Sequence, residues 1–293
     1  MQIESLKVFC DLVESESFTK TAQINNVTQS AVSQTISTLE QRFKSLLIER
    51  SKKNFRLTPE GEVLYDYSKR ILQTHEALQN TMQDLKQVVS GDIRMATIYS
   101  IGLHALPPCL KQFLKGNPNV RVHLQYRHAD QVYEDVLGNI VDLGLVAYPA
   151  RDAGVEIVHL RKDPQVLICA PGHPLARSKS VRVKALDGQK FVCFQKDIPT
   201  QKALDRIFKT AGVKVRPMMT FDNVETVKRA VEIDAGVAIV PENTIRLEVS
   251  NQTLVAIRLE GADFGRPLGL LYKKGKVLSP AMKQFVALLK ESL

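Results

Sequence analysis

The chain has 293 residues, of which 44% are hydrophobic and 24% are charged, and it carries a formal net charge of +9. This composition is ordinary for a soluble globular protein of about two domains, and the positive charge makes polyanions plausible partners. The chain has no repeat, no low-complexity segment, no secretory signal and no apolar stretch near the roughly 18 residues of a membrane span, so we expect a cytoplasmic protein that does not contact membranes.

Residues 1–58 predict three short helices separated by tight polar breaks. Apolar residues recur at the spacing of one helix face, at Leu6, Phe9, Cys10 and Val13. Ser17 is placed to cap a second helix that carries Phe18 and Ala22, and Thr28 to cap a third. The third helix has an apolar face, formed by Val32, Ile36 and Leu39.

The opposite face of the third helix is polar and lacks acidic residues. Its members are Gln29, Ser30, Ser33, Gln34, Ser37 and Thr38. A helix fits the DNA major groove, where glutamine can bond adenine with two hydrogen bonds and serine can bond several bases. The alternative is a small helical bundle whose polar face is only solvated.

A basic segment follows this helix. It contains one acid, Glu49, and six cations, Arg42, Lys44, Arg50, Lys52, Lys53 and Arg56. Two short apolar-containing segments flank a polar tip at 51–54, which predicts a hairpin suited to phosphates or a minor groove. Residues 1–58 hold eight cations and six acids, a net +2, so the DNA hypothesis depends on local clustering rather than on total charge.

A long helix is predicted over residues 59–89. Thr58 and Pro59 form a strong helix start, and a heptad series follows at Leu64, Ile71, Leu78 and Leu85. The companion series is mixed, at Ser68, His75, Met82 and Val89. This pattern favours a helix that pairs with a second helix, although a helix lying on a core would look similar.

From Asp92 onward, predicted strands alternate with helices. The strands are 93–98, 120–126, 141–148, 155–160, 165–170, 190–194, 237–241, 254–259 and 267–272. The helices are 103–114, 131–137, 201–210, 224–233 and 280–291. This alternation predicts an α/β domain with a mostly parallel sheet, large enough to divide into two lobes.

The run SFTKTAQINNVTQSAVSQTISTLEQRF, followed by LIERSKKNFRLTPEG, resembles the N-terminal domain of LysR-type transcriptional regulators. The resemblance implies an α/β fold class: an N-terminal winged helix-turn-helix (1–58), a long linker helix that dimerises (59–89) and a two-lobed periplasmic-binding-protein-like effector domain (90–293). It implies a lobe one of 91–160 plus 266–293, and a lobe two of 161–265. The implied partners are double-stranded DNA, a small-molecule effector, further copies in a homodimer or tetramer, and RNA polymerase.

The resemblance also assigns the DNA-binding residues. Thr28–Leu39 becomes the recognition helix, in which Gln29, Ser33 and Gln34 occupy positions that commonly face bases. Ser30 stands where many members have proline, and Gln34 where many have arginine, so the operator preference is expected to differ. The complete set of expected DNA contacts is Thr28, Gln29, Ser30, Ser33, Gln34, Arg50, Lys52, Lys53 and Arg56.

The family plan places the effector between the lobes, at strand ends and helix starts. Such places border the crevice of an open sheet and present N–H groups to an anion. The expected contacts are Ser100, Ile101, Gly102, Ala129, Ala147, Tyr148, Phe194, Thr200 and Asn223. Ser100 is the best single candidate, with a simple helix cap as its alternative. Arg127 and His128 could meet an anion or remain solvated, and we expect a small organic anion as effector.

The sequence leaves two other function classes as alternatives. Residues 92–293 alone would suit a solute-binding protein without a DNA-binding role, but such a protein would require export. Ser17 and Lys20 fit the SxxK pattern of acyl-transfer enzymes without its partner motifs. The six histidines and the four scattered cysteines show no metal-ligand spacing. We therefore expect no enzyme activity, no cofactor, no metal and buried, reduced thiols.

Overall fold

The computed structural model describes residues 2–50, 55–85 and 89–293. Its N-terminal unit, residues 2–50 and 55–58, contains three helices: α1 (Ile3–Ser15), α2 (Phe18–Asn25) and α3 (Gln29–Phe43). They pack around one apolar core with Phe9, Leu12 and Val32 at its centre, each fully buried. The helical spacing in the sequence is therefore confirmed as the spacing of a core face.

Capping residues set where these helices begin and end. The Ser17 side chain accepts a hydrogen bond from the backbone N–H of Lys20 at 3.3 Å, and Thr28 accepts one from Ala31 at 3.2 Å. Asn26 adopts a left-handed conformation with φ 53° and ends α2. Both predicted caps are confirmed, and the SxxK pair is a helix cap rather than a catalytic arrangement.

A short hairpin and a long helix follow. Strands β1 (Ile48–Arg50) and β2 (Phe55–Leu57) pair antiparallel, as the sequence predicted, while the tip at 51–54 lies outside the described residues. Helix α4 (Pro59–Leu85) begins after Thr58, whose hydroxyl accepts from Gly61 N–H at 3.0 Å. A Cβ on Gly61 would lie 2.1 Å from the carbonyl oxygen of Leu47, so only glycine lets α4 approach the hairpin base this closely.

Lobe one is built around three parallel strands. They are β3 (Gly91–Thr97), β4 (Val120–Tyr126) and β5 (Leu143–Ala147). The covering helices are η1 (Ile101–Ala105), α5 (Leu106–Gly116), α6 (Ala129–Leu137) and α10 (Pro280–Ser292). One apolar cluster joins β3 and β5 to α5 and α10, and a second lies under α6.

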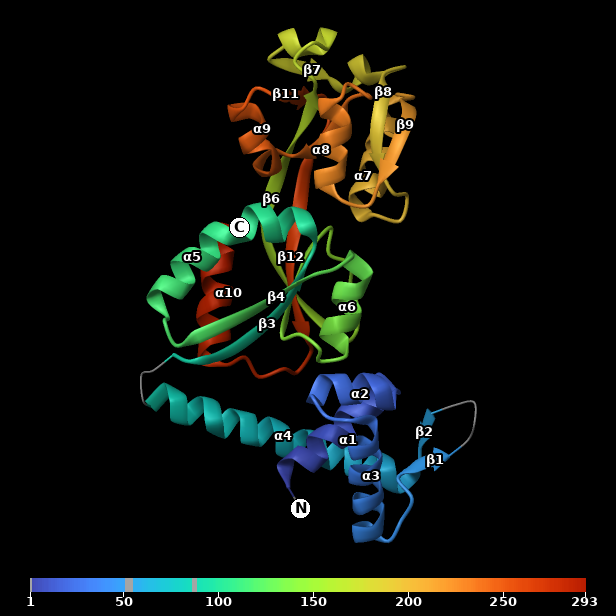
Figure 1. The fold of residues 1–293 in the computed structure, drawn as a ribbon, viewed down its shortest axis with the longest axis vertical. Coiled ribbons are helices and arrows are strands. Elements are labelled where there is room, and N and C mark those ends of the chain that lie inside the picture. The colour runs from blue at the N-terminus through green and yellow to red at the C-terminus, as the bar shows by residue number, and fades with distance from the viewer. Residues whose placement is uncertain (1, 51–54, 86–88) are drawn as a thin grey trace.

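Lobe two lies at the far end of the molecule (Figure 1). Its strands are β7 (Ser180–Arg182), β8 (Lys190–Phe194), β9 (Arg216–Phe221), β10 (Ala238–Pro241) and β11 (Val255–Glu260). Its helices are η2 (Pro174–Arg177), η3 (Val183–Leu186), α7 (Pro199–Ala211), α8 (Val224–Glu232), η4 (Glu242–Ile245) and α9 (Arg246–Ser250). Two further apolar clusters stabilise it, so each lobe has its own core.

Two long antiparallel strands run between the lobes (Figure 1), namely β6 (Val155–Cys169) and β12 (Gly265–Lys273). The main sheet has the order β4-β3-β5-β12-β6-β11-β7, with β10 also paired to β6. The prediction of a mostly parallel sheet is wrong, because β12 pairs antiparallel with β5 and β6, and β10 and β11 do so with β6. The predicted strands 155–160 and 165–170 are one continuous strand.

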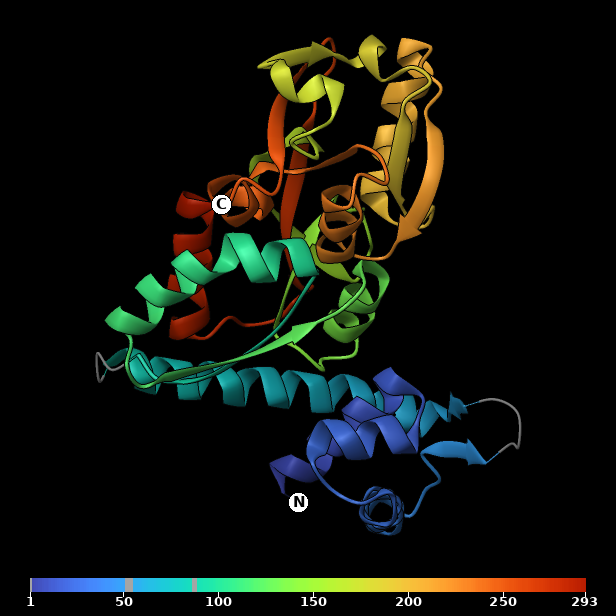
Figure 2. The same cartoon turned by 45° about the horizontal axis from the view of Figure 1, so that its top comes forward.

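Helix α4 lies beneath lobe one, with the N-terminal unit at one end (Figures 1 and 2). No helix in the described ranges is long and apolar enough to cross a membrane. All four cysteines are free and buried, and burial raises the pKa of the Cys10 thiol to about 12. Such a thiol is unreactive, as expected for a packing residue.

Candidate DNA-binding and effector sites

Helix α3 separates a buried face from a polar, solvent-exposed face. Val32, Ile36 and Leu39 are at most 4% exposed and fix the helix on the N-terminal unit. The exposed side chains include all four residues predicted on the helix to contact DNA: Gln29, Ser30, Ser33 and Gln34. Thr28 is exposed but already caps the helix, and its hydroxyl lies 2.9 Å from that of Ser30. The face therefore presents polar side chains with hydrogen-bond donors and acceptors to solvent.

The predicted wing cations are only partly described. Arg56 on β2 is exposed, and its backbone pairs with Glu49 on β1. Lys52 and Lys53 lie outside the described residues, and only the backbone of Arg50 is described.

A cavity of about 370 Å³ lies between the lobes. Seven of the nine residues predicted to contact an effector line it. Ser100, Ala129, Ala147 and Tyr148 come from lobe one, and Phe194, Thr200 and Asn223 from lobe two. The predicted strand ends and helix starts therefore meet around one space, although they are distant in the chain.

The other two predicted residues do not line this cavity. Ile101 is fully buried in the apolar cluster of lobe one. Gly102 is also buried, and a Cβ there would lie 2.5 Å from the Cγ2 of Thr97 and 2.6 Å from Tyr126. Gly102 thus allows close packing of the first helical turn on the sheet, which is a structural role.

Helix N-termini surround the cavity. The first residues of α6, α7 and α8, namely Ala129, Pro199 and Val224, all line it. Each N-terminus carries a partial positive charge. Asn223 lines the cavity too, but its side-chain oxygen caps α8 by accepting from the N–H groups of Glu225 and Thr226.

The cavity is lined by both basic and acidic side chains. Arg127 donates to Asp135 at 3.1 Å and to Gln125 at 2.8 Å, so its charge is largely offset. His128 and Lys202 are exposed at the rim, as is Asp130. Asp197 and Asp222 line the cavity as well, so it is not strongly cationic.

Arg266 lies at the cavity floor, and the sequence interpretation missed it. It is 2% exposed; its Nη1 donates to Ser100 Oγ at 2.9 Å and its Nη2 to Asp163 at 2.6 Å. Ser100 makes no capping hydrogen bond, so the simple-cap alternative for Ser100 is wrong. Ser100 and Arg266 are 166 positions apart in the chain, and no local pattern could have paired them.

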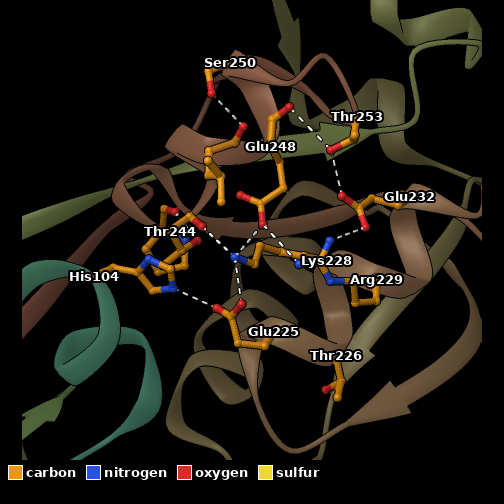
Figure 3. A network of polar contacts seen from close by, with 12 residues as sticks. His104, Glu225, Thr226, Lys228, Arg229, Glu232, Thr244, Glu248, Ser250 and Thr253 are labelled. Carbon is orange, nitrogen blue, oxygen red and sulfur yellow. Dashed lines mark hydrogen bonds and ion pairs between the residues drawn. The ribbon is translucent and has the colours of Figure 1, made fainter.

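A second polar network joins the lobes beside the cavity (Figure 3). His104 of lobe one meets Glu225 of lobe two, with 2.7 Å between Nε2 and Oε1. Lys228, 2% exposed, bonds Glu225 at 3.0 Å, Glu248 at 2.9 Å and the Thr244 carbonyl at 2.8 Å. Burial alone would raise the pKa of Glu225, but His104 and Lys228 hold the pKa of this carboxyl below its ordinary value. The lobes are therefore joined by a charge-assisted contact as well as by two strands.

Glu14 joins the N-terminal unit, α4 and lobe one. Its nearly buried carboxylate accepts from Tyr65 at 3.0 Å and pairs with Lys69 at 3.1 Å, both on α4. From lobe one, Asn139 donates at 2.7 Å and Lys273 lies at 2.5 Å. Burial would raise the pKa of Glu14, but Lys273 and Lys69 keep it below its ordinary value.

No group of three or more histidine, cysteine or acidic side chains in the described part of the chain is placed to hold a metal ion. The chemistry that the two sites offer is recognition: an exposed polar helix face and a half-enclosed cavity with hydrogen-bond donors.

Comparison with known families gives two matches that together cover nearly the whole chain. Residues 3–62 match the model described as "Bacterial regulatory helix-turn-helix protein, lysR family". Residues 86–293 match the model described as "LysR substrate binding domain". A solute-binding protein without a DNA-binding role does not account for the first match.

Similar proteins match either the whole chain or a large part of it. The RuBisCO operon transcriptional regulator of Allochromatium vinosum is 30% identical, over 97% of this chain and 94% of its own. A full-length OxyR variant from Pseudomonas aeruginosa shares the fold with a TM-score of 0.73 at 17% identity, covering 100% of this chain and 94% of that one. The CcmR regulatory domain of Synechocystis PCC6803 in complex with 2-PG has a TM-score of 0.63 at 23% identity. The match covers 69% of this chain and 98% of that domain.

Proposed function

The chain belongs to the LysR family of DNA-binding transcriptional regulators, a family of non-enzymes with an effector-binding domain, and from this premise we propose that a small organic anion is its effector. The anion binds in the cavity between the lobes. The observation that carries this proposal is the convergence of the α6, α7 and α8 N-termini on one cavity of about 370 Å³. Helix N-termini stabilise anions without the need for a free cation.

DNA reading is divided between two surfaces. Gln29, Ser33 and Gln34 on the exposed face of α3 contact base edges in the major groove and give sequence preference. Arg56, with Arg50, Lys52 and Lys53, contacts phosphates or the minor groove and gives affinity that depends on salt. The backbone hydrogen bonds between β1 and β2 hold the base of this wing.

The protein binds DNA as a homodimer through α4, with tetramers forming as pairs of dimers. Support comes from large apolar side chains between the middle and the end of α4, where Ile71 is 41%, Leu78 59% and Met82 50% exposed. Three exposed apolar residues at heptad-like spacing are typical of a helix that packs against a partner. Two copies joined in this way present two recognition helices to a roughly palindromic operator.

A gel-shift assay with genomic fragments tests the DNA role, and thermal unfolding tests the effector role. We expect retardation of particular fragments that weakens steeply with salt. We also expect metabolite anions, with 2-PG as the first probe because it occupies a similar domain, to raise the unfolding temperature. Stabilisation by neutral or cationic ligands alone would contradict the anionic effector but leave the DNA role intact.

A further inference from the structure

We propose that Arg266 is a positioning residue that forces Ser100 to act as a hydrogen-bond donor, so that the cavity floor selects the carboxylate or carbonyl end of an effector. This inference rests on the proposed effector role of the cavity and specifies which chemical group enters its floor. It depends on three side chains from separate parts of the chain: Ser100, Asp163 and Arg266.

Arg266 is held rigidly. It lies near the start of β12 directly opposite Asp163 of β6, and the two residues are 2% and 5% exposed. The Nη2–Oδ2 distance of 2.6 Å makes this a close, buried ion pair. Because Asp163 offsets its charge, Arg266 contributes directed N–H groups to the floor more than it contributes positive potential.

The direction of the Ser100 hydroxyl follows from this pairing. A guanidinium can only donate, so Ser100 Oγ must accept from Nη1 across 2.9 Å. The hydroxyl hydrogen then points elsewhere, and among the described residues no acceptor bonds it. Ser100 is 7% exposed and lines the cavity, so the O–H is available to a ligand there.

The same guanidinium carries a second unpaired donor. Arg266 Nε is buried without a hydrogen-bond partner among the described residues, and Arg266 also lines the cavity. A donor left unpaired is costly, so the Ser100 hydroxyl favours a ligand that supplies an acceptor over a ligand that supplies only donors. A carboxylate or carbonyl oxygen can accept from the Ser100 hydroxyl, whereas an ammonium group can only donate.

The test uses the full-length protein and three probes with one skeleton: benzoate, benzamide and benzylamine, titrated by calorimetry, with 2-PG as a fourth. Benzamide keeps an acceptor without a charge, and benzylammonium has only donors. We expect the affinity order benzoate, benzamide, benzylamine. Ser100→Ala should weaken benzoate about 10- to 100-fold and benzamide about 3- to 10-fold, and leave benzylamine unchanged.

A double variant tests the positioning role of Arg266. Arg266→Gln with Asp163→Asn removes the ion pair without leaving a buried charge, and it frees Ser100 Oγ to accept. We expect the benzamide-to-benzylamine ratio to fall about tenfold, whereas a merely structural role would weaken all probes together. Lys202→Met, which removes an exposed rim cation, is the control and should weaken only the anions, about 2- to 5-fold.

Three results would overturn the proposal. One is a wild-type protein that binds benzylamine as well as benzamide. Another is a benzamide-to-benzylamine affinity ratio that is the same in the double variant as in the wild type. The third is a protein that binds none of the four probes. If that protein still binds specific DNA, the proposal for the cavity fails while the proposed DNA-binding role stands.

Discussion

The recognition helix and the cavity floor hold their polar groups in opposite ways. On α3, Gln29, Ser33 and Gln34 are exposed, and no described residue bonds their side chains. At the floor, Ser100 and Arg266 are almost fully buried and each has a fixed partner. Exposed groups can adapt to a base sequence, whereas buried and oriented groups accept one ligand chemistry. The two surfaces should therefore respond differently to substitution.

The largest effect is expected at the floor. Arg266→Met would leave Asp163 buried and unpaired, and the free energy of unfolding should fall by about 3–5 kcal/mol. Urea unfolding measures this loss. The matched Lys202→Met variant should change stability by less than about 0.5 kcal/mol, and equal losses in both would show that the floor is not specially constrained.

Substitution on α3 should affect DNA discrimination without affecting stability. Gln29→Ala is expected to reduce the preference for a bound fragment over a scrambled one by about 1–3 kcal/mol. Arg56→Gln should instead weaken both DNAs equally and flatten the dependence of affinity on salt. Competition titrations at several salt concentrations separate the two effects. If both variants lose the same affinity for both DNAs, the proposed division between base contacts and phosphate contacts is contradicted.

A smaller effect is expected where the N-terminal unit meets lobe one. Lys273→Met removes one of four partners of Glu14, and should lower the free energy of unfolding by about 1–2 kcal/mol. Lys274→Met makes the same change at the exposed neighbouring position and should have little effect. If the two variants unfold alike, the contact between the unit and lobe one contributes little in solution.

The smallest expected effect is a pH dependence at the same contact. Because the folded-state pKa of Glu14 lies below its ordinary 4.5, its contribution to stability is complete above that pH and is lost as the pH falls through the folded-state value. The stability difference between wild type and Glu14→Gln should therefore be constant from pH 6 to 8 and shrink below about pH 4.5. A difference that grows in acid would contradict this assignment.

Local sequence patterns predicted most of the secondary structure of the N-terminal unit. Ser17 and Thr28 act within three residues of their own position, so the sequence alone identifies them as caps. The cavity was predicted only through the family resemblance, which places the effector at helix starts and strand ends between the lobes. Arg266 was missed because its partners, Ser100 and Asp163, are brought near by the two strands between the lobes. Strand β9 was missed as well, since its exposed residues show no alternation.

The most direct test of the account asks whether a cavity ligand controls DNA reading. The affinity of the full-length protein for a selected genomic fragment is measured with and without a carboxylate that binds the cavity, in wild type and in Ser100→Ala. Linkage requires that a ligand which favours one DNA-binding geometry change the affinity for DNA. We predict a change of at least about fivefold in wild type and a clearly smaller change in Ser100→Ala at a ligand concentration that just saturates wild type. An unchanged affinity in a wild-type protein saturated with ligand would contradict the account.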